Sequence, residues 1–225
     1  MARVWSIVVA GGSGRRFGRP KQFAALAGRP VLAWAVEACR PWSDGVVLVV
    51  PAGGDHVDAY GADAVVPGGL TRADSVRRGL AAVPPEAEVV IVHDAARPLA
   101  SAALFRAVID AVTEKGDADG AVPGLPVGDT IKVVDEARTV TRTLDRASLV
   151  AVQTPQAFRA EILRRAHEEA GAAAHSSPGA PTDDAMLVEA LGATVRVVEG
   201  EPGNIKITTP ADLETAARLL ETRGA

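Results

Sequence analysis

Short apolar runs alternate with helical patterns along the whole chain. Each run is rich in Val or Ile and is bounded by Gly, Pro or Asp, which is typical of strands in a sheet covered on both faces. The expected strands are Trp5–Val9, Val46–Val50, Ala64–Val66, Val89–Val92, Gly120–Val122 and Thr194–Val198. The expected helices are Pro30–Cys39, Ala73–Val83, Ser101–Glu114, Ala160–Ala170, Asp183–Leu191 and Pro210–Glu221. This alternation predicts an α/β fold with a doubly wound, mostly parallel sheet, as one domain over residues 1–225.

Two segments break this alternation. Gly171–Pro181 is rich in Gly, Ala, Ser and Pro and is expected to be a mobile loop. In Asp129–Asp145 the apolar period drops to two around the turn Asp135–Arg138, which predicts a protruding β-hairpin. Because an isolated hairpin is marginal in water, it must lie on its own domain or on a partner chain. We favour the partner chain, since no other segment offers a second core, and expect a dimerisation arm over residues 127–153.

Composition narrows the possible classes. The 225 residues are 48% hydrophobic and carry a net charge of −4, so we expect one substantial core and no nucleic-acid surface. No apolar segment approaches the roughly 18 residues of a membrane span, and the run Val4–Ala10 is better explained as a strand than as a signal peptide. A cytoplasmic protein without membrane contact is expected. The lone Cys39 is expected to be buried, and the four histidines show no paired metal spacing.

A glycine-rich loop follows the first expected strand, at the edge where such sheets bind ligands. It reads Ala10-Gly11-Gly12-Ser13-Gly14-Arg15-Arg16-Phe17 and continues to Pro20-Lys21-Gln22. The glycines expose backbone N–H groups, and Arg16 and Lys21 can meet the oxygens of a triphosphate. Phe17 breaks the dinucleotide fingerprint, and neither a P-loop nor a nucleophile elbow fits the spacing. The alternative to a phosphate site is a glycine turn with solvated arginines.

The loop resembles the signature loop of the sugar-phosphate nucleotidyltransferases. Further motifs are Gly68-Gly69-Leu70-Thr71-Arg72-Ala73-Asp74-Ser75-Val76, His93-Asp94-Ala95-Ala96-Arg97-Pro98, Asp129-Thr130-Ile131-Lys132, Asp145-Arg146, Gln153-Thr154-Pro155-Gln156 and Asn204-Ile205-Lys206. In this order they resemble the 2-C-methyl-D-erythritol 4-phosphate cytidylyltransferases of isoprenoid biosynthesis, from about residue 5 to 220. The resemblance implies a Rossmann-like nucleotidyltransferase fold, transfer of CMP from CTP to that acceptor, release of pyrophosphate and a homodimer.

The helix after the third strand offers polar groups at its start. Arg72, Ser75 and Arg77 suit a nucleotide, but Asp74 and Ser75 could equally cap the first turn. The resemblance implies that Ser75 and the Gly69 backbone contact the base or ribose of CTP. The residues expected to bind CTP are Ala10, Gly11, Gly12, Gly14, Lys21, Gly69 and Ser75. Leu70 departs from many relatives, which carry a polar or acidic residue there.

Asp94 follows a buried strand and is expected to lie at its carboxyl end. A carboxylate beside a triphosphate suits Mg²⁺, the expected cofactor, although Asp94 could instead pair with Arg97 or start the next helix. The resemblance places Asp94, Arg97 and Lys206 at the acceptor, whereas a lone Lys is usually solvated. His93 is expected to be a core or hydrogen-bonded residue. Thr182-Asp183-Asp184 is expected to be a helix cap with helix-start charges.

The resemblance also implies that Thr130 and Arg146, at the two ends of the hairpin, reach into the partner's site. Arg16 and Lys21 would face the α-phosphate and pyrophosphate, while Arg146 and Lys206 would hold the attacking phosphate. No general base is required, because a phosphomonoester is mostly dianionic at neutral pH. The alternatives are a ribitol 5-phosphate cytidylyltransferase, a sugar-1-phosphate uridylyl- or guanylyltransferase, and a nucleotide sensor without catalysis.

Overall fold

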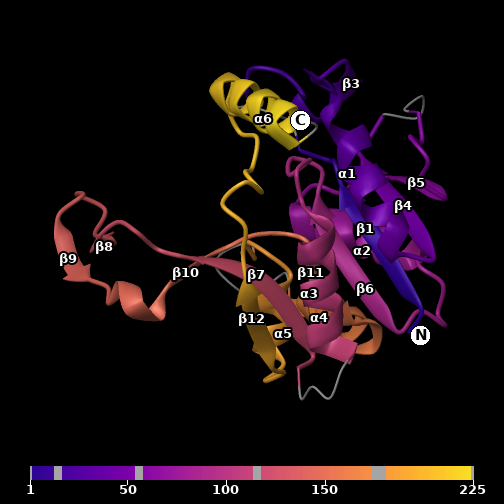
Figure 1. Ribbon diagram of the computed structural model, residues 1–225. Coiled ribbons are helices and arrows are strands. Elements are labelled where there is room, and N and C mark those ends of the chain that lie inside the picture. The colour runs from indigo at the N-terminus through magenta and orange to yellow at the C-terminus, as the bar shows by residue number, and fades with distance from the viewer. Residues whose placement is uncertain (1, 13–16, 54–57, 114–117, 174–180, 224–225) are drawn as a thin grey trace.

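The computed structural model describes residues 2–12, 17–53, 58–113, 118–173 and 181–223 (Figure 1). Its described part holds an eight-stranded sheet in the order β10-β7-β11-β6-β1-β4-β5, with β12 paired to β7. The strands are β1 (Val4–Val9), β4 (Gly45–Val50), β5 (Ala64–Pro67), β6 (Val89–Asp94), β7 (Gly120–Pro126), β10 (Val150–Val152), β11 (Gln156–Arg159) and β12 (Val195–Glu199). Strands β1, β4, β5 and β6 run parallel, as do β7 and β12, so the mostly parallel sheet is confirmed.

Helices cover both faces of the sheet, as expected of a doubly wound fold. They are α1 (Val31–Cys39), α2 (Arg72–Ala82), α3 (Ala102–Thr113), α4 (Ala160–Ala173), α5 (Ala185–Ala190) and α6 (Pro210–Arg223). In β4, Val46 and Leu48 pack into one core with α1 and α3, whereas Val47 and Val49 pack into the other core with α2, α4 and α5. This alternation explains why β4 is apolar at nearly every position. Buried Cys39 lies in the first core, as predicted.

Two strands of this eight-stranded sheet were not predicted from the sequence. Strand β11 runs antiparallel between β6 and β7, and β10 pairs antiparallel with the end of β7. Helix α4 also differs, because it continues to Ala173 instead of ending at the expected loop. The expectation of a loop is therefore wrong for residues 171–173, and residues 174–180 of that loop lie outside the described residues.

A third, smaller core forms around helix α6. Helix α6 packs Ala216 against Phe17, Leu26 and Ile207, next to the short strands β2 (Ala25–Leu26) and β3 (Arg29–Pro30). The 3-10 turn η2 (Lys21–Phe23) precedes β2, and the turn η3 (Arg40–Trp42) follows α1. This packing fixes the segment around Ile207 against the segment around Lys21. In the described residues, no helix combines the length and apolar character needed to cross a membrane.

The predicted hairpin is confirmed and projects from the body of the molecule (Figure 1). Its strands are β8 (Lys132–Val134) and β9 (Val140–Thr143), and the 3-10 turn η4 (Arg146–Ser148) leads back to β10. The register shifts between Val133 and Val134, so Val134 pairs with Val140. Both of these valines are about half exposed. The arm therefore presents apolar side chains to its surroundings.

Candidate active site

Two adjoining cavities open at the carboxyl ends of the central parallel strands. The first has a volume of about 490 Å³ and contains most of the predicted nucleotide-binding residues, namely Ala10, Gly11, Gly12, Lys21, Gly69 and Ser75. The second has a volume of about 210 Å³ and is lined by Arg97, Gln153, Thr154, Gln156, Thr182 and Asp183, among others. Arg72, Asp94 and Lys206 line both cavities. These three residues therefore mark the boundary at which the contents of the two cavities would meet.

The glycine-rich loop forms one wall of the first cavity. The side chain of Gln22 donates a hydrogen bond from Nε2 to the carbonyl oxygen of Gly12 at 3.1 Å. Lys21 donates from Nζ to the carbonyl oxygen of Ile207 at 2.6 Å. The first contact is local to the loop, whereas the second joins it to a segment 186 residues away in the chain. The predicted residues Gly14 and Arg16 lie outside the described residues.

The start of α2 forms the opposite wall. Thr71 and Asp74 make a reciprocal capping box, which satisfies the first turn of the helix. Ser75 accepts a hydrogen bond at Oγ from Gly69 N at 3.1 Å and donates to Thr71 O at 2.9 Å. Of the two roles open from the sequence, Asp74 is thus the capping residue, whereas Ser75 fixes Gly69 at the cavity. Leu70 beside them is fully exposed and lines the first cavity.

Asp94 is held by two cations at the boundary of the cavities. Its Oδ2 lies 2.6 Å from Lys206 Nζ and its Oδ1 lies 3.3 Å from Arg72 Nε. Burial alone would raise the pKa of Asp94, but the charges of Arg72 and Lys206 outweigh it and hold the pKa well below the ordinary value. The suggested pairing of Asp94 with Arg97 is wrong. Arg97 instead donates to the carbonyl oxygens of Asn204 at 2.7 Å and Val152 at 3.4 Å.

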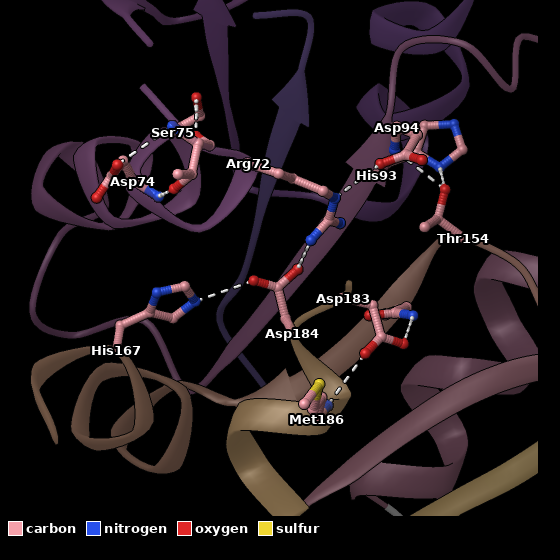
Figure 2. Close-up of polar contacts among 12 residues, drawn as sticks. Arg72, Asp74, Ser75, His93, Asp94, Thr154, His167, Asp183, Asp184 and Met186 are labelled. Carbon is pink, nitrogen blue, oxygen red and sulfur yellow. Dashed lines mark hydrogen bonds and ion pairs between the residues drawn. The ribbon is translucent and has the colours of Figure 1, made fainter. Parts of the chain in front are cut away.

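Arg72 links this boundary to a buried pair behind it (Figure 2). Its Nη1 lies 2.6 Å from Asp184 Oδ2, and Asp184 Oδ1 lies 2.9 Å from His167 Nε2. Asp184 and His167 are both buried. The expectation that Thr182-Asp183-Asp184 only caps a helix is therefore wrong for Asp184, which makes no side-chain cap. Asp183 does cap α5, because its Oδ1 accepts from Met186 N at 3.1 Å.

His93 is a structural residue, as expected. Its ring nitrogens contact Thr154 Oγ1 and Arg97 O, each at 3.1 Å, and its ring packs against Phe105. Burial lowers the pKa of His93 to about 4, so the imidazole is neutral at physiological pH. A neutral ring enclosed by protein groups supports the strand end that carries Asp94.

The family of the chain follows from its sequence as a whole. A sequence model of the family IspD, 2-C-methyl-D-erythritol 4-phosphate cytidylyltransferase, matches residues 4–222. The chain belongs to this family. IspD proteins are cytidylyltransferases, so this protein is an enzyme. The order of motifs, from the glycine-rich loop to Asn204-Ile205-Lys206, therefore indicated the correct family.

Individual relatives agree with the family match. The chain is 42% identical to a 2-C-methyl-D-erythritol 4-phosphate cytidylyltransferase of Pelotomaculum thermopropionicum, covering 99% of this chain and 96% of the relative. It is 46% identical to a bifunctional enzyme IspD/IspF of Anaeromyxobacter dehalogenans, covering 97% of this chain but 57% of that enzyme. A crystal structure of 2-C-methyl-D-erythritol 4-phosphate cytidylyltransferase from Thermus thermophilus superposes with a TM-score of 0.80 at 35% identity, covering 96% and 98% of the two chains.

Two predicted site residues of this IspD-family chain do not join the others. Thr130 and Arg146 lie on the arm, and neither lines either of the two cavities described above. Arg146 donates to Gly128 O at 2.9 Å. Two residues outside the expected catalytic and binding set, Arg72 and Asp184, are central to the observed network. Arg72 was considered for a nucleotide because of its place at the start of a helix, whereas its pairing with Asp94 and Asp184 on other segments has no local sequence signal.

Proposed function

We propose that the protein transfers CMP from CTP to 2-C-methyl-D-erythritol 4-phosphate in isoprenoid biosynthesis. The products are 4-diphosphocytidyl-2-C-methyl-D-erythritol and pyrophosphate. The observation that carries this proposal is the pair of adjoining cavities with Arg72, Asp94 and Lys206 at their boundary. The glycine-rich loop suits a triphosphate in the first cavity, and the polar second cavity suits a small phosphorylated polyol. The names of the full-length relatives supply the identity of both substrates.

The proposed reaction depends on placement and charge. An oxygen of the acceptor phosphate forms a bond to the α-phosphorus of CTP, and the bond to the bridging oxygen breaks as pyrophosphate leaves. The acceptor phosphate is mostly dianionic at neutral pH, so no residue has to remove a proton. Lys206 lies at the cavity boundary, where it can hold the attacking phosphate, and Lys21 lies in the nucleotide cavity. Fixed charges of this kind stabilise the transition state without reorganisation.

Mg²⁺ is proposed as the counter-ion of CTP. In the described part of the chain, no group of three His, Cys, Asp or Glu side chains is placed to hold a metal. Both oxygens of Asp94 already contact cations, so the metal-ligand role predicted for Asp94 does not fit the observed ion pairs. The metal would be bound by phosphate oxygens of CTP and by several of the waters that Mg²⁺ usually keeps. The roles proposed for Lys21 and Lys206 do not depend on a metal ion bound by protein side chains.

A homodimer is proposed through the arm at residues 127–153. The arm projects from the body (Figure 1). The side chains of Val134 and Val140 on this arm are exposed. Thr130 and Arg146 would then complete the acceptor site of the partner subunit. We also propose a cytoplasmic location.

Pyrophosphate release tests the proposed function directly. The protein is incubated with CTP, Mg²⁺ and 2-C-methyl-D-erythritol 4-phosphate, with ribitol 5-phosphate and UTP as parallel substitutions. Release that requires CTP and the methylerythritol acceptor is the expected result. Release with ribitol 5-phosphate instead would assign a different acceptor, and CTP binding without release from any pair would indicate a nucleotide sensor.

A further inference from the structure

The second cavity carries opposite charges on different elements. Lys206 follows β12, and Arg97 follows β6, whereas the acidic Asp183 comes from the segment just before α5. A phosphorylated polyol has a matching asymmetry, with an anionic phosphate at one end and neutral hydroxyls at the other. Cations suit the phosphate, and a carboxylate accepts hydrogen bonds from hydroxyl groups. The cavity could thus bind such a molecule in one orientation.

The carboxylate of Asp183 is held in place by two protein groups. Its Oδ2 accepts from Gln156 Nε2 at 3.1 Å and its Oδ1 accepts from Met186 N at 3.1 Å (Figure 2). An ionised carboxylate can accept about four hydrogen bonds, so each oxygen keeps further capacity. Asp183 is half-buried and lines the cavity. The contact that caps α5 therefore uses only part of the hydrogen-bond accepting capacity of this carboxylate.

Gln156 supplies an independent indication that the cavity takes a polar ligand. This side chain is 1% exposed and lines the second cavity from β11. Its amide nitrogen contacts Asp183 Oδ2 and Gln153 O, which directs the amide oxygen elsewhere. Among the described residues that oxygen has no hydrogen-bond partner. Two cations of the same cavity, Arg72 and Arg97, also each carry a buried nitrogen without a partner in the described part of the chain. Buried polar atoms are nearly always paired in proteins, so their concentration around one cavity indicates a polar occupant.

We propose that Asp183 is a specificity-determining residue, whose carboxylate accepts hydrogen bonds from the hydroxyl end of the acceptor. Gln156 is its positioning residue, because it fixes one carboxylate oxygen from a buried strand. This role rests on the proposed function and identifies the group that recognises the hydroxyl end of the acceptor. It has a second consequence, since a carboxylate repels a like charge. The site should reject phosphorylated sugar acids, which carry a carboxylate in place of the terminal hydroxyl.

Variants of Asp183 and Gln156 test the proposal by steady-state pyrophosphate release. In Asp183→Asn, kcat/KM for 2-C-methyl-D-erythritol 4-phosphate should fall about 10- to 100-fold through a higher KM, because a charge-assisted hydrogen bond is lost. The KM for CTP should not change. The ratio of kcat/KM for this acceptor to that for D-erythronate 4-phosphate should fall by at least about 10-fold, since the repulsive charge is gone. Gln156→Met should change the same parameters in the same direction.

The controls separate this role from capping and from the proposed function itself. Asp119 accepts from Thr194 N beside the start of β7, so Asp119→Asn removes a carboxylate charge outside both cavities and should leave every constant unchanged. Wild-type protein without pyrophosphate release would overturn the proposed function. Active wild type, with acceptor constants and the acceptor ratio unchanged in both variants, would overturn the role of Asp183. If Asp183→Asn fails to fold by circular dichroism, the acceptor ratio of Gln156→Met decides, because this variant keeps the contact between Asp183 and Met186 N that caps α5.

Discussion

Lys206 Nζ lies 2.6 Å from Asp94 Oδ2, although 112 residues separate them in the chain. Asp94 ends β6, and Lys206 lies on the segment between β12 and α6. The ion pair joins these segments at the boundary of the two cavities. It orients the lysine in advance, which is what an electrostatic role in phosphoryl transfer requires.

Replacing Lys206 tests that role. We expect Lys206→Met to lower kcat by about 10²- to 10³-fold, because one preorganised positive charge is removed from the attacking phosphate. Initial rates of pyrophosphate release give the constants. Arg165→Met is a matched control, since Arg165 is exposed on α4 and pairs only with Glu169 of the same helix among the described ion pairs. A turnover number within about twofold of wild type in Lys206→Met would remove Lys206 from the mechanism.

The buried carboxylate of Asp184 should be a major determinant of stability. Asp184→Ala leaves Arg72 and His167 without their common partner inside the protein. Breaking a buried ion pair on one side costs about 3–5 kcal/mol, so the free energy of unfolding in urea should fall by that amount. Glu169→Ala breaks an exposed pair on α4 and should cost less than about 1 kcal/mol. If both variants lost an equally small amount of unfolding free energy, Asp184 would not be a major determinant of stability.

His93 should make the protein less stable in mild acid. Its pKa is about 4 when folded, so between that value and the ordinary value near 6.5 the unfolded chain binds a proton that the folded chain does not. Stability therefore falls as pH drops from about 6.5 to 4, by a total of about 3 kcal/mol. Thermal melting across this range measures the loss, which His93→Gln should abolish. Asp94 and Asp184, whose pKa values are lowered, lose their contributions only below about pH 4.

Two glycines of the nucleotide cavity should respond differently to alanine. A Cβ at Gly69 would lie 2.2 Å from Asp74 Cβ, so Gly69→Ala must displace the capping box of α2. We expect a stability loss of about 1–3 kcal/mol together with a higher KM for CTP. A Cβ at Gly12 meets no atom within 4 Å among the described residues. Gly12→Ala should therefore keep its melting temperature and raise only the KM for CTP. An equal fall in melting temperature in both variants would show that the glycine-rich loop has no space for a Cβ at Gly12.

The sheet was largely predictable because its strands carry their own pattern. Val46–Val50 is apolar throughout, as required of a strand between two cores, and the structure places it there. Strand β11 has no such pattern. Its only apolar residues, Ala157 and Phe158, are flanked by Gln156 and Arg159. The buried Gln156 is tolerated because its amide nitrogen finds acceptors on Gln153 and Asp183. Contacts of this kind depend on the assembled fold and leave no local periodicity.

The candidate site was predictable only in part, for the same reason. The glycine-rich loop and the Gly68-Gly69 approach are local in sequence, and the structure brings Gly12 and Gly69 to one cavity. Asp184 was assigned to a helix start because its neighbours suggested one. Its actual partners, Arg72 and His167, come from two other helices. A buried charge has to be paired, but the sequence alone does not identify the distant partner.

Complementation between inactive variants tests the proposal that the arm completes the active site of a partner subunit. If Arg146 acts on the partner subunit, Arg146→Ala and Lys21→Ala damage the same site when they come from different chains. A mixed dimer then holds one site with both defects and one intact site. Random mixing gives half mixed dimers, so about a quarter of the wild-type activity should return when the two inactive proteins are denatured and refolded together. Each variant refolded alone is the control. If Arg146 acted within its own chain, every site would keep one defect, and the mixture would be as inactive as its components. The first outcome is the expected one, because Arg146 lines neither of the two cavities of its own chain and donates instead to Gly128 O within the arm.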